Sequence, residues 1–171
     1  KEVDYVLDAV ENGWYETYDL HIRKLERTFA NYVNTQYAIA TYCGTHALHL
    51  ATIALGLTKG DEVIVTDQSY IATAQAISYV GATCVFIDID PETLGINPDL
   101  IEAAITDKTK AIMVVHFAGM AVDMDRIMDI AKRYHLKVIE DACQMVGGRY
   151  KGKFAGTIGD IGVYSFQGSK I

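Results

Sequence analysis

The sequence has no excess of basic residues, no long apolar run and no secretory leader, and each absence excludes a class of protein. It has 15 Lys and Arg residues against 22 Asp and Glu residues, a net charge of −7. Binding a nucleic-acid backbone needs a basic face, so we expect no nucleic-acid partner. No apolar stretch reaches the roughly 20 residues that cross a bilayer, and Lys1–Asp4 does not resemble a signal sequence. We therefore expect no membrane partner.

Paired cysteines are also missing. Cys43, Cys84 and Cys143 stand far apart, and no Cys-x-x-Cys occurs. An odd number of isolated cysteines does not indicate a disulfide framework. A reducing compartment is the simplest interpretation, so we expect a cytoplasmic protein. The acidic charge does not exclude a phosphorylated ligand, because helix N-termini bind phosphate through backbone amides.

Two nucleotide-binding motifs are absent or incomplete. No Gly-x-Gly-x-x-Gly occurs, which weakens a dehydrogenase interpretation. The run from Gly147 to Lys153 has the spacing of a P-loop, but Phe154 stands where Ser or Thr would bind magnesium. We reject a P-loop on that ground.

A metal site is suggested by Cys43, His46 and His49, which recur at three-residue spacing. Gly44 argues against a helix that includes Cys43, and two histidines on a helix are more often packed or solvated than bound to a metal. We expect no metal site.

Helical and strand patterns alternate along the chain. The apolar spacing predicts helices over 2–11, 20–33, 44–55, 72–79 and 123–134, with another that begins at Asn97-Pro98. It predicts strands over 37–41, 62–66, 84–89, 110–115, 136–140 and 162–166, and a loop over 147–162. The strands are nearly continuous apolar runs, which indicates burial on both faces. We predict an α/β fold with a mostly parallel sheet covered by helices on both faces.

Ligands of such sheets bind beyond the carboxyl ends of the strands. Asp88, His116 and Asp141 are expected there, and Lys170 follows Ser165 by five residues in the same region. From spacing alone, Asp141 and Lys170 are better explained as a surface ion pair and a solvated lysine.

The motifs taken together resemble the DegT/StrS family of sugar aminotransferases, and they cover essentially the whole chain in order. They are Gly13-Trp14, Cys43–Leu50, Gly60–Val65, Tyr70–Ala74, Gly81-Ala82, Val85–Pro91, Ala104–Thr106, Thr109–Ile112, Asp123–Asp125, Ile139–Gln144, Gly159–Gly162, Ser165-Phe166 and Lys170.

The resemblance implies the large domain of a fold-type I enzyme that uses pyridoxal 5'-phosphate (PLP). Residues 1–171 would form an N-terminal segment and this PLP-binding domain. Because the chain lacks an initial Met and stops at Ile171, we expect a fragment without its C-terminal small domain.

The family's roles fall on matching positions. Lys170 would form the Schiff base with the cofactor and then move a proton. Asp141 would keep the pyridine nitrogen protonated. Gln144 would lie near the ring hydroxyl, and Tyr70 would stack on the ring.

The cofactor phosphate would be bound by Gly44 and Thr45 at a helix N-terminus, with a hydroxyl from Ser165. Without the resemblance, Thr45 is a simple helix cap, Ser165 a satisfied strand end and Tyr70 an ordinary core aromatic.

The implied reaction transfers an amino group from L-glutamate or L-glutamine to a keto-sugar nucleotide, in a homodimer with shared active sites. A keto-cyclitol acceptor is an alternative, because the run Ser165–Lys170 also resembles the aminocyclitol branch. A sugar dehydratase would have His in place of Lys170, and a cofactor-free regulatory paralogue is a further alternative. The runs Trp14–His21 and Met120–Val122 depart from the family pattern, so the acceptor stays open.

Overall fold

The computed structural model describes residues 1–170, and the chain divides into two compact units, Lys1–Ala40 and Thr41–Ile171. The first unit contains α1 (Glu2–Asn12), η1 (Tyr15–Thr17) and α2 (Leu20–Val33). A contact between His21 Nε2 and Asp8 Oδ2, at 2.9 Å, joins α2 to α1. Both predicted helices of this unit are confirmed. Within residues 1–170, none of the helices combines the length and apolarity needed to cross a membrane.

The predicted strand over 37–41 is wrong, because these residues form no regular structure. The backbone N–H of Ala40 donates instead to the Glu26 carboxylate of α2, at 2.9 Å. A strand needs a neighbour that takes its backbone hydrogen bonds, and this short run pairs with none of the described strands.

The second unit is built on a five-stranded parallel sheet in the order β2-β1-β3-β4-β7. Its strands are β1 (Glu62–Thr66), β2 (Thr83–Ile87), β3 (Thr109–Val115), β4 (Lys137–Asp141) and β7 (Ile161–Val163). The three central strands are buried along most of their length. This burial agrees with their continuous apolar sequences and confirms the predicted fold class.

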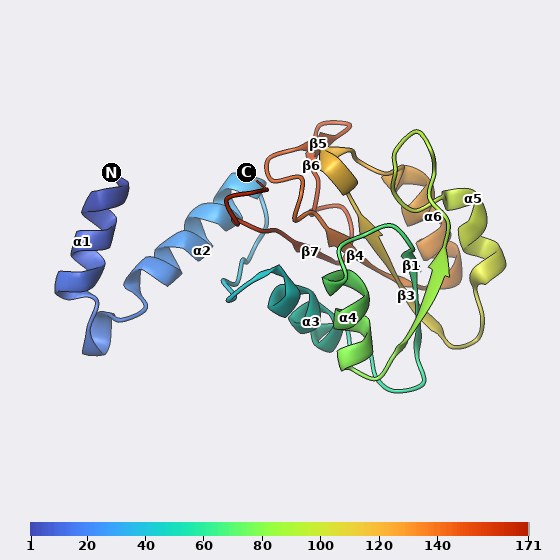
Figure 1. Cartoon of the computed structure of the whole chain (residues 1–171), viewed down its shortest axis with the longest axis horizontal. Helices are drawn as coiled ribbons and strands as arrows, with labels where there is room; N and C mark the ends of the chain where they lie inside the picture. The colour runs from blue at the N-terminus through green and yellow to red at the C-terminus, as the bar shows by residue number, and fades with distance from the viewer. Residues whose placement is uncertain (171) are drawn as a thin grey trace. The chain divides into compact units, whose positions relative to one another are not determined.

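Helices cover both faces of the sheet, as Figure 1 shows. Successive strand residues point to opposite faces, so Val63 and Val65 pack in one core and Ile64 in the other. The first core lies under α3 (Gly44–Ala54) and α4 (Ala72–Tyr79). The second lies under α5 (Pro98–Ile101), η2 (Glu102–Ala104) and α6 (Met124–Tyr134).

The N-termini of α5 and α6 are both capped by a side chain, and Asp123 is the cap of α6 and not its first residue. The Asn97 side chain accepts a hydrogen bond from the Asp99 amide at 2.9 Å, with Pro98 in the first turn of α5. The Asp123 carboxylate accepts from the Arg126 amide at 3.3 Å. Each cap satisfies an amide that has no partner within its helix.

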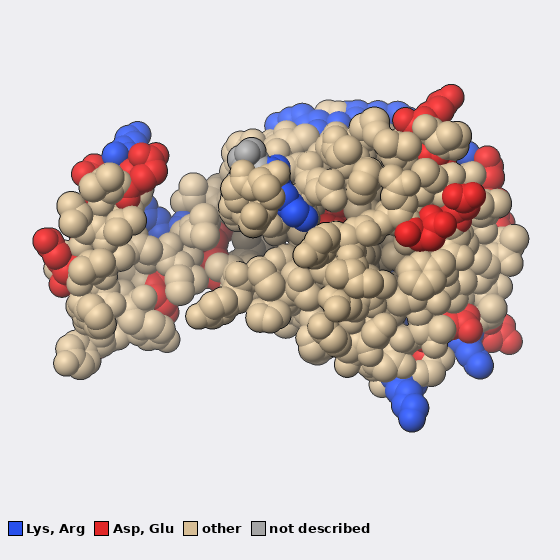
Figure 2. Space-filling view, in the orientation of Figure 1, with Lys and Arg blue, Asp and Glu red and all other residues tan. Residues whose placement is uncertain are grey.

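Two predicted boundaries at the C-terminal end of the unit are wrong. The last strand ends at Val163 and not at Phe166, because its partner β4 ends at Asp141 and offers no ladder beyond that point. The predicted loop over 147–162 contains a hairpin of β5 (Arg149–Tyr150) and β6 (Lys153–Phe154). Figure 2 shows basic side chains along the edge where this hairpin lies.

Because the central strands are buried on both faces, a cavity made at one of them should lower the stability of the protein. Ile112 of β3 is fully buried, and Ile112→Ala is expected to lower the free energy of unfolding by about 2–5 kcal/mol, because removed methyl groups leave unfilled space. Lys110→Ala, at an exposed position of the same strand, is the control, with a change within about 0.5 kcal/mol. Urea unfolding of both variants measures the difference. Equal losses would contradict burial of the strand on this face.

Candidate active site at the carboxyl edge of the sheet

Asp141 is the last residue of β4, and its carboxylate is held from two sides. It is 6% exposed. Its Oδ2 accepts a hydrogen bond from the Thr73 hydroxyl of α4 at 2.9 Å, and its Oδ1 accepts from the Cys143 amide at 3.1 Å. The structure therefore places an oriented carboxylate where a parallel sheet binds its ligands.

Lys170 lies in the same region of the unit. Its Nζ is 5.4 Å from the centroid of the Tyr70 ring, which belongs to the segment between β1 and α4. Burial raises the pKa of the Cys143 thiol, the Asp141 carboxylate raises it further, and the Lys170 ammonium acts in the opposite direction. Asp141 and Lys170 therefore both lie within electrostatic range of the Cys143 thiol.

The N-terminus of α3 reaches this region as well. Cys43 precedes the helix in an extended conformation and makes no side-chain cap. The first intrahelical hydrogen bond runs from the Ala47 amide to the Cys43 carbonyl, at 3.0 Å. The amides of Gly44, Thr45 and His46 therefore have no partner within the helix, and together with the helix dipole they favour an anion.

At Gly44 the backbone of α3 comes close to Cys143 and Ser165. A Cβ atom there would lie 3.0 Å from Cys143 Sγ and 3.9 Å from Ser165 Cβ. The start of α3, the end of β4 and the segment after β7 therefore converge. Ser165 lies two residues beyond β7, and not at the end of the predicted strand.

Gln144 is turned toward η3 (Phe117–Gly119), where its Oε1 accepts from the Ala118 amide at 3.0 Å. Its Nε2 remains as a donor. The structure thus places Lys170 beside Tyr70, and the start of α3 beside Cys143 and Ser165. The individual roles predicted for these residues stay predictions.

Glu140 is a buried residue of this region whose role the sequence did not indicate. Its Oε1 accepts from the Ile158 and Gly159 amides, both at 2.6 Å, and its Oε2 accepts from the Gly156 amide at 2.8 Å. The His116 Nε2 atom lies 3.0 Å from the same Oε2. The sequence did contain a signal for this buried site, because Glu140 directly follows the apolar residues Val138 and Ile139 within a predicted strand.

The hydrogen bonds of His116 assign its proton. The Val122 amide donates to His116 Nδ1 at 3.4 Å, so Nε2 carries the proton and donates to Glu140. Burial raises the pKa of the Glu140 carboxyl, but the hydrogen bonds from His116 and from the Gly159 and Gly156 amides outweigh it. The pKa lies below its ordinary value of 4.5.

The sequence also did not indicate the contact of Thr73 with Asp141, although Thr73 lies within the motif Tyr70–Ala74. Its hydroxyl is 2.7 Å from that of Ser69, and the four-residue spacing of two hydroxyl residues was the signal. Ser69 in turn lines a hollow of about 490 Å³ at the ends of the strands, whose other lining residues are Asp67, Gln68, Asp88, Ile89 and Phe117.

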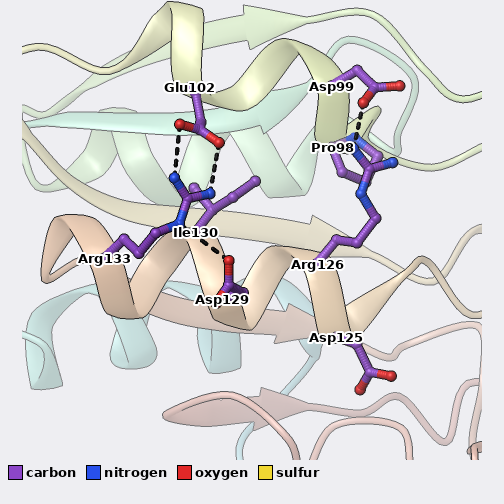
Figure 3. A pocket seen from close by; sticks show the side chains of 8 residues that line it. All are labelled: Pro98, Asp99, Glu102, Asp125, Arg126, Asp129, Ile130 and Arg133. Atoms are coloured by element: carbon purple, nitrogen blue, oxygen red, sulfur yellow. Dashed lines mark hydrogen bonds and ion pairs between the residues drawn. The ribbon is translucent and has the colours of Figure 1, made fainter.

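A second hollow, of about 390 Å³, lies between α5 and α6 (Figure 3). Arg133 donates to both Glu102 oxygens, at 2.9 and 2.6 Å, and to Asp129 at 3.1 Å. Hydrogen bonds from Arg133 and Tyr134 lower the pKa of Glu102 to about 2. Arg126 pairs with Asp99 across the same groove. The two arginines are therefore paired with carboxylates across the groove. These ion pairs hold α6 against α5 and η2 and leave neither arginine available for a reaction.

Cys43 is extended and lies outside α3, so Cys43, His46 and His49 do not share one helix face. The His49 ring instead packs edge-on against Tyr79, with centroids 5.3 Å apart. No group of three potential metal ligands occurs within residues 1–170.

The fold defines a class of protein, a parallel α/β domain with a buried carboxylate at the end of β4 and the N-terminus of α3 packed beside it. The chain belongs to the DegT/DnrJ/EryC1/StrS aminotransferase family, whose model matches residues 1–171. The family resemblance inferred from the motifs is therefore confirmed.

Three similar proteins illustrate the family. A GDP-perosamine synthase of Caulobacter vibrioides is 46% identical over 170 residues, which cover 99% of this chain and 46% of the relative. A crystal structure of 3-amino-5-hydroxybenzoic acid synthase matches with a TM-score of 0.93 and 36% identity, over 99% of this chain and 44% of that one. NtdA from Bacillus subtilis, with bound cofactor PMP, matches with a TM-score of 0.75 and 45% identity, over 79% and 31% of the chains. The chain spans about half the length of the curated relatives it matches.

The four hydrogen bonds of Glu140 predict a large loss of stability in Glu140→Gln. The amide group of Gln would face backbone N–H donors, so we expect a loss of about 3–5 kcal/mol at neutral pH. Urea unfolding measures it, and Glu92→Gln, at an exposed position, is the control.

Comparison of Glu140→Gln with the unmodified protein also tests how stability depends on pH. Because the folded pKa of Glu140 is depressed, its stabilisation is fully present above about pH 4.5 and is lost as the pH falls through the folded pKa. The stability difference between Glu140→Gln and the unmodified protein should therefore shrink below pH 4.5. A difference that stays constant in acid would show that the ionised carboxylate is not the stabilising form.

Proposed function

We propose that this chain is the N-terminal segment and cofactor-binding large domain of a PLP-dependent aminotransferase that aminates a keto-sugar attached to a nucleotide. The observation that carries the proposal is a set of contacts beyond the carboxyl edge of the sheet: Lys170 lies beside Tyr70, Thr73 donates to Asp141, and Gly44 at the start of α3 approaches Cys143. Family membership supports it. The 46% identical relative is named for a nucleotide-linked amino sugar, which supports the class of acceptor.

The residues of the site fit PLP, which has a pyridine nitrogen, an aldehyde and a phosphate. Asp141 is a carboxylate with one donor on each oxygen, so lone pairs remain for a protonated ring nitrogen. Lys170 supplies the primary amine for the aldehyde, and the Tyr70 ring beside it supplies an apolar stacking surface. The free amides at the start of α3, with the hydroxyls of Thr45 and Ser165, suit the phosphate.

When bound, PLP supplies an electron sink for the carbon that loses its proton. Asp141 would hold a proton on the ring nitrogen by its negative charge. Lys170 would bind the aldehyde carbon and, once displaced by an amino substrate, would move the proton at the substrate carbon. Gln144 would donate from Nε2 to the ring hydroxyl. Cys143, with its raised pKa, stays a neutral thiol beside these charges.

The amino donor is L-glutamate or L-glutamine in this proposal, and the enzyme is a cytoplasmic homodimer whose subunits share their active sites. Lysine at position 170 favours amino transfer over the dehydratase reaction, for which the family uses histidine. A nucleotide-free ring ketone is the second candidate, because the TM-score of 0.93 relates the chain to a synthase of an amino-substituted carbocycle. A screen of keto-sugar nucleotides and keto-cyclitols against the full-length enzyme in its amino-loaded form decides between them.

Lys170→Ala tests the covalent role. The variant should fold, lose the visible absorbance band of the bound cofactor, and turn over about 10²–10⁴-fold more slowly, because the amine no longer moves the proton. Borohydride treatment followed by peptide mapping should find pyridoxyl mass at residue 170 in the unmodified enzyme. Lys153→Ala, at an exposed position, should keep both the band and the activity. Retained activity in Lys170→Ala would overturn the assignment.

Asp141→Asn tests the charge opposite the ring nitrogen. A neutral side chain of similar shape no longer holds the proton, so kcat should fall by about 100- to 1000-fold, while the Kd for PLP rises less than about tenfold. Steady-state kinetics and equilibrium dialysis give the two numbers. Asp107→Asn, at an exposed position, is the control. Unchanged turnover in Asp141→Asn would remove this role.

A further inference from the structure

Thr73 contacts the Asp141 carboxylate from a different layer of the fold. It lies in the first turn of α4 and is 1% exposed, and its hydroxyl donates to Asp141 Oδ2 at 2.9 Å across 68 positions of sequence. The other carboxylate oxygen is bound by the Cys143 amide, which lies on the same strand end. Thr73 is therefore the contact that fixes the carboxylate relative to α4.

The hydroxyl of Thr73 has a defined direction. An ionised carboxylate only accepts hydrogen bonds, and a hydroxyl has one proton to donate. Thr73 gives that proton to Asp141, so the 2.7 Å contact with Ser69 must be a bond from the Ser69 hydroxyl to the Thr73 oxygen. The two hydroxyls form a one-way chain that ends on the carboxylate.

The local backbone explains why these two residues meet. The Thr73 amide donates to the Tyr70 carbonyl at 3.1 Å, so a helical turn begins before α4 itself. Ser69 directly precedes this turn, and its hydroxyl lies 2.7 Å from that of Thr73. Ser69 also lines the hollow at the strand ends. The series of hydrogen bonds therefore begins at this hollow, with Ser69, and ends at the buried Asp141 carboxylate.

We propose that Thr73 is a positioning residue for Asp141, and that Ser69 holds the Thr73 hydroxyl in its donating direction. The proposal rests on the proposed function, since it gives the pair a role in holding the carboxylate that faces the cofactor's ring nitrogen. Without the hydroxyl of Thr73, the carboxylate loses a donor and its fixed orientation, and its interaction with the ring proton weakens.

Three variants test the chain. Thr73→Val keeps the shape and removes the hydroxyl, Thr73→Ser restores a hydroxyl, and Ser69→Ala removes only the outer member. Ser78→Ala is the matched control, because this exposed residue of α4 donates to the Ala74 carbonyl of its own helix, at 3.1 Å, and is not among the hydrogen-bond partners of the Thr73 and Asp141 side chains within residues 1–170.

Two readouts are needed, and one of them does not depend on activity. The ¹⁵N chemical shift of PLP labelled at its ring nitrogen reports whether that nitrogen is protonated in the full-length enzyme. In Thr73→Val we expect this shift to move toward the unprotonated value, and kcat to fall by about 10- to 100-fold, the range for losing a hydrogen bond to a charged group. Ser69→Ala should give a smaller change in the same direction. Thr73→Ser should return within about threefold of the unmodified enzyme, and Ser78→Ala should change neither readout.

The outcomes separate this inference from the proposed function. If Thr73→Val lowers the urea midpoint but leaves the ¹⁵N shift and kcat unchanged, Thr73 is only structural and the inference is overturned. An Asp141→Asn background should abolish the further effect of Thr73→Val on kcat, and an undiminished effect there would also overturn it. If the unmodified enzyme binds no PLP, the proposed function itself fails.

Discussion

The structure depends on one buried carboxylate, that of Glu140. Removing an anion from water costs several kcal/mol unless its lone pairs are filled, and here four donors fill them. One donor comes from the end of β3 through His116, and three come from the segment 156–159 that leads into β7. The chain therefore folds with these segments in one arrangement, and this arrangement sets Asp141 beside the strand that leads to Lys170.

The sheet could be predicted because its central strands are continuous apolar runs in the sequence. A run such as Val63–Val65 has no polar face, which fits only a strand covered on both sides, and both cores contain its residues. The run 37–41 has a similar composition, but whether a strand forms depends on a neighbour that the local sequence does not specify. For the same reason β7 stops where β4 stops, at a point that the sequence of residues 162–166 does not reveal.

The site was predictable only in part. Asp141 and Lys170 stand in a recognisable motif, and Gly44 opens a helix, so resemblance was enough to select them. The contact between Thr73 and Asp141 spans 68 positions, and it exists because α4 packs over the sheet in a particular register. The partners of Glu140 are backbone amides of residues whose side chains give no hint of the contact. Contacts of this kind follow from tertiary packing.

The three thiols of the chain have very different surroundings. Burial raises the pKa of both Cys84 and Cys143, so at neutral pH these two are protonated and poorly nucleophilic. Cys43 is exposed and immediately precedes the free amides at the start of α3. An electrophilic label added to the folded protein therefore modifies Cys43 first, and a fluorophore attached there would lie directly before the first turn of α3.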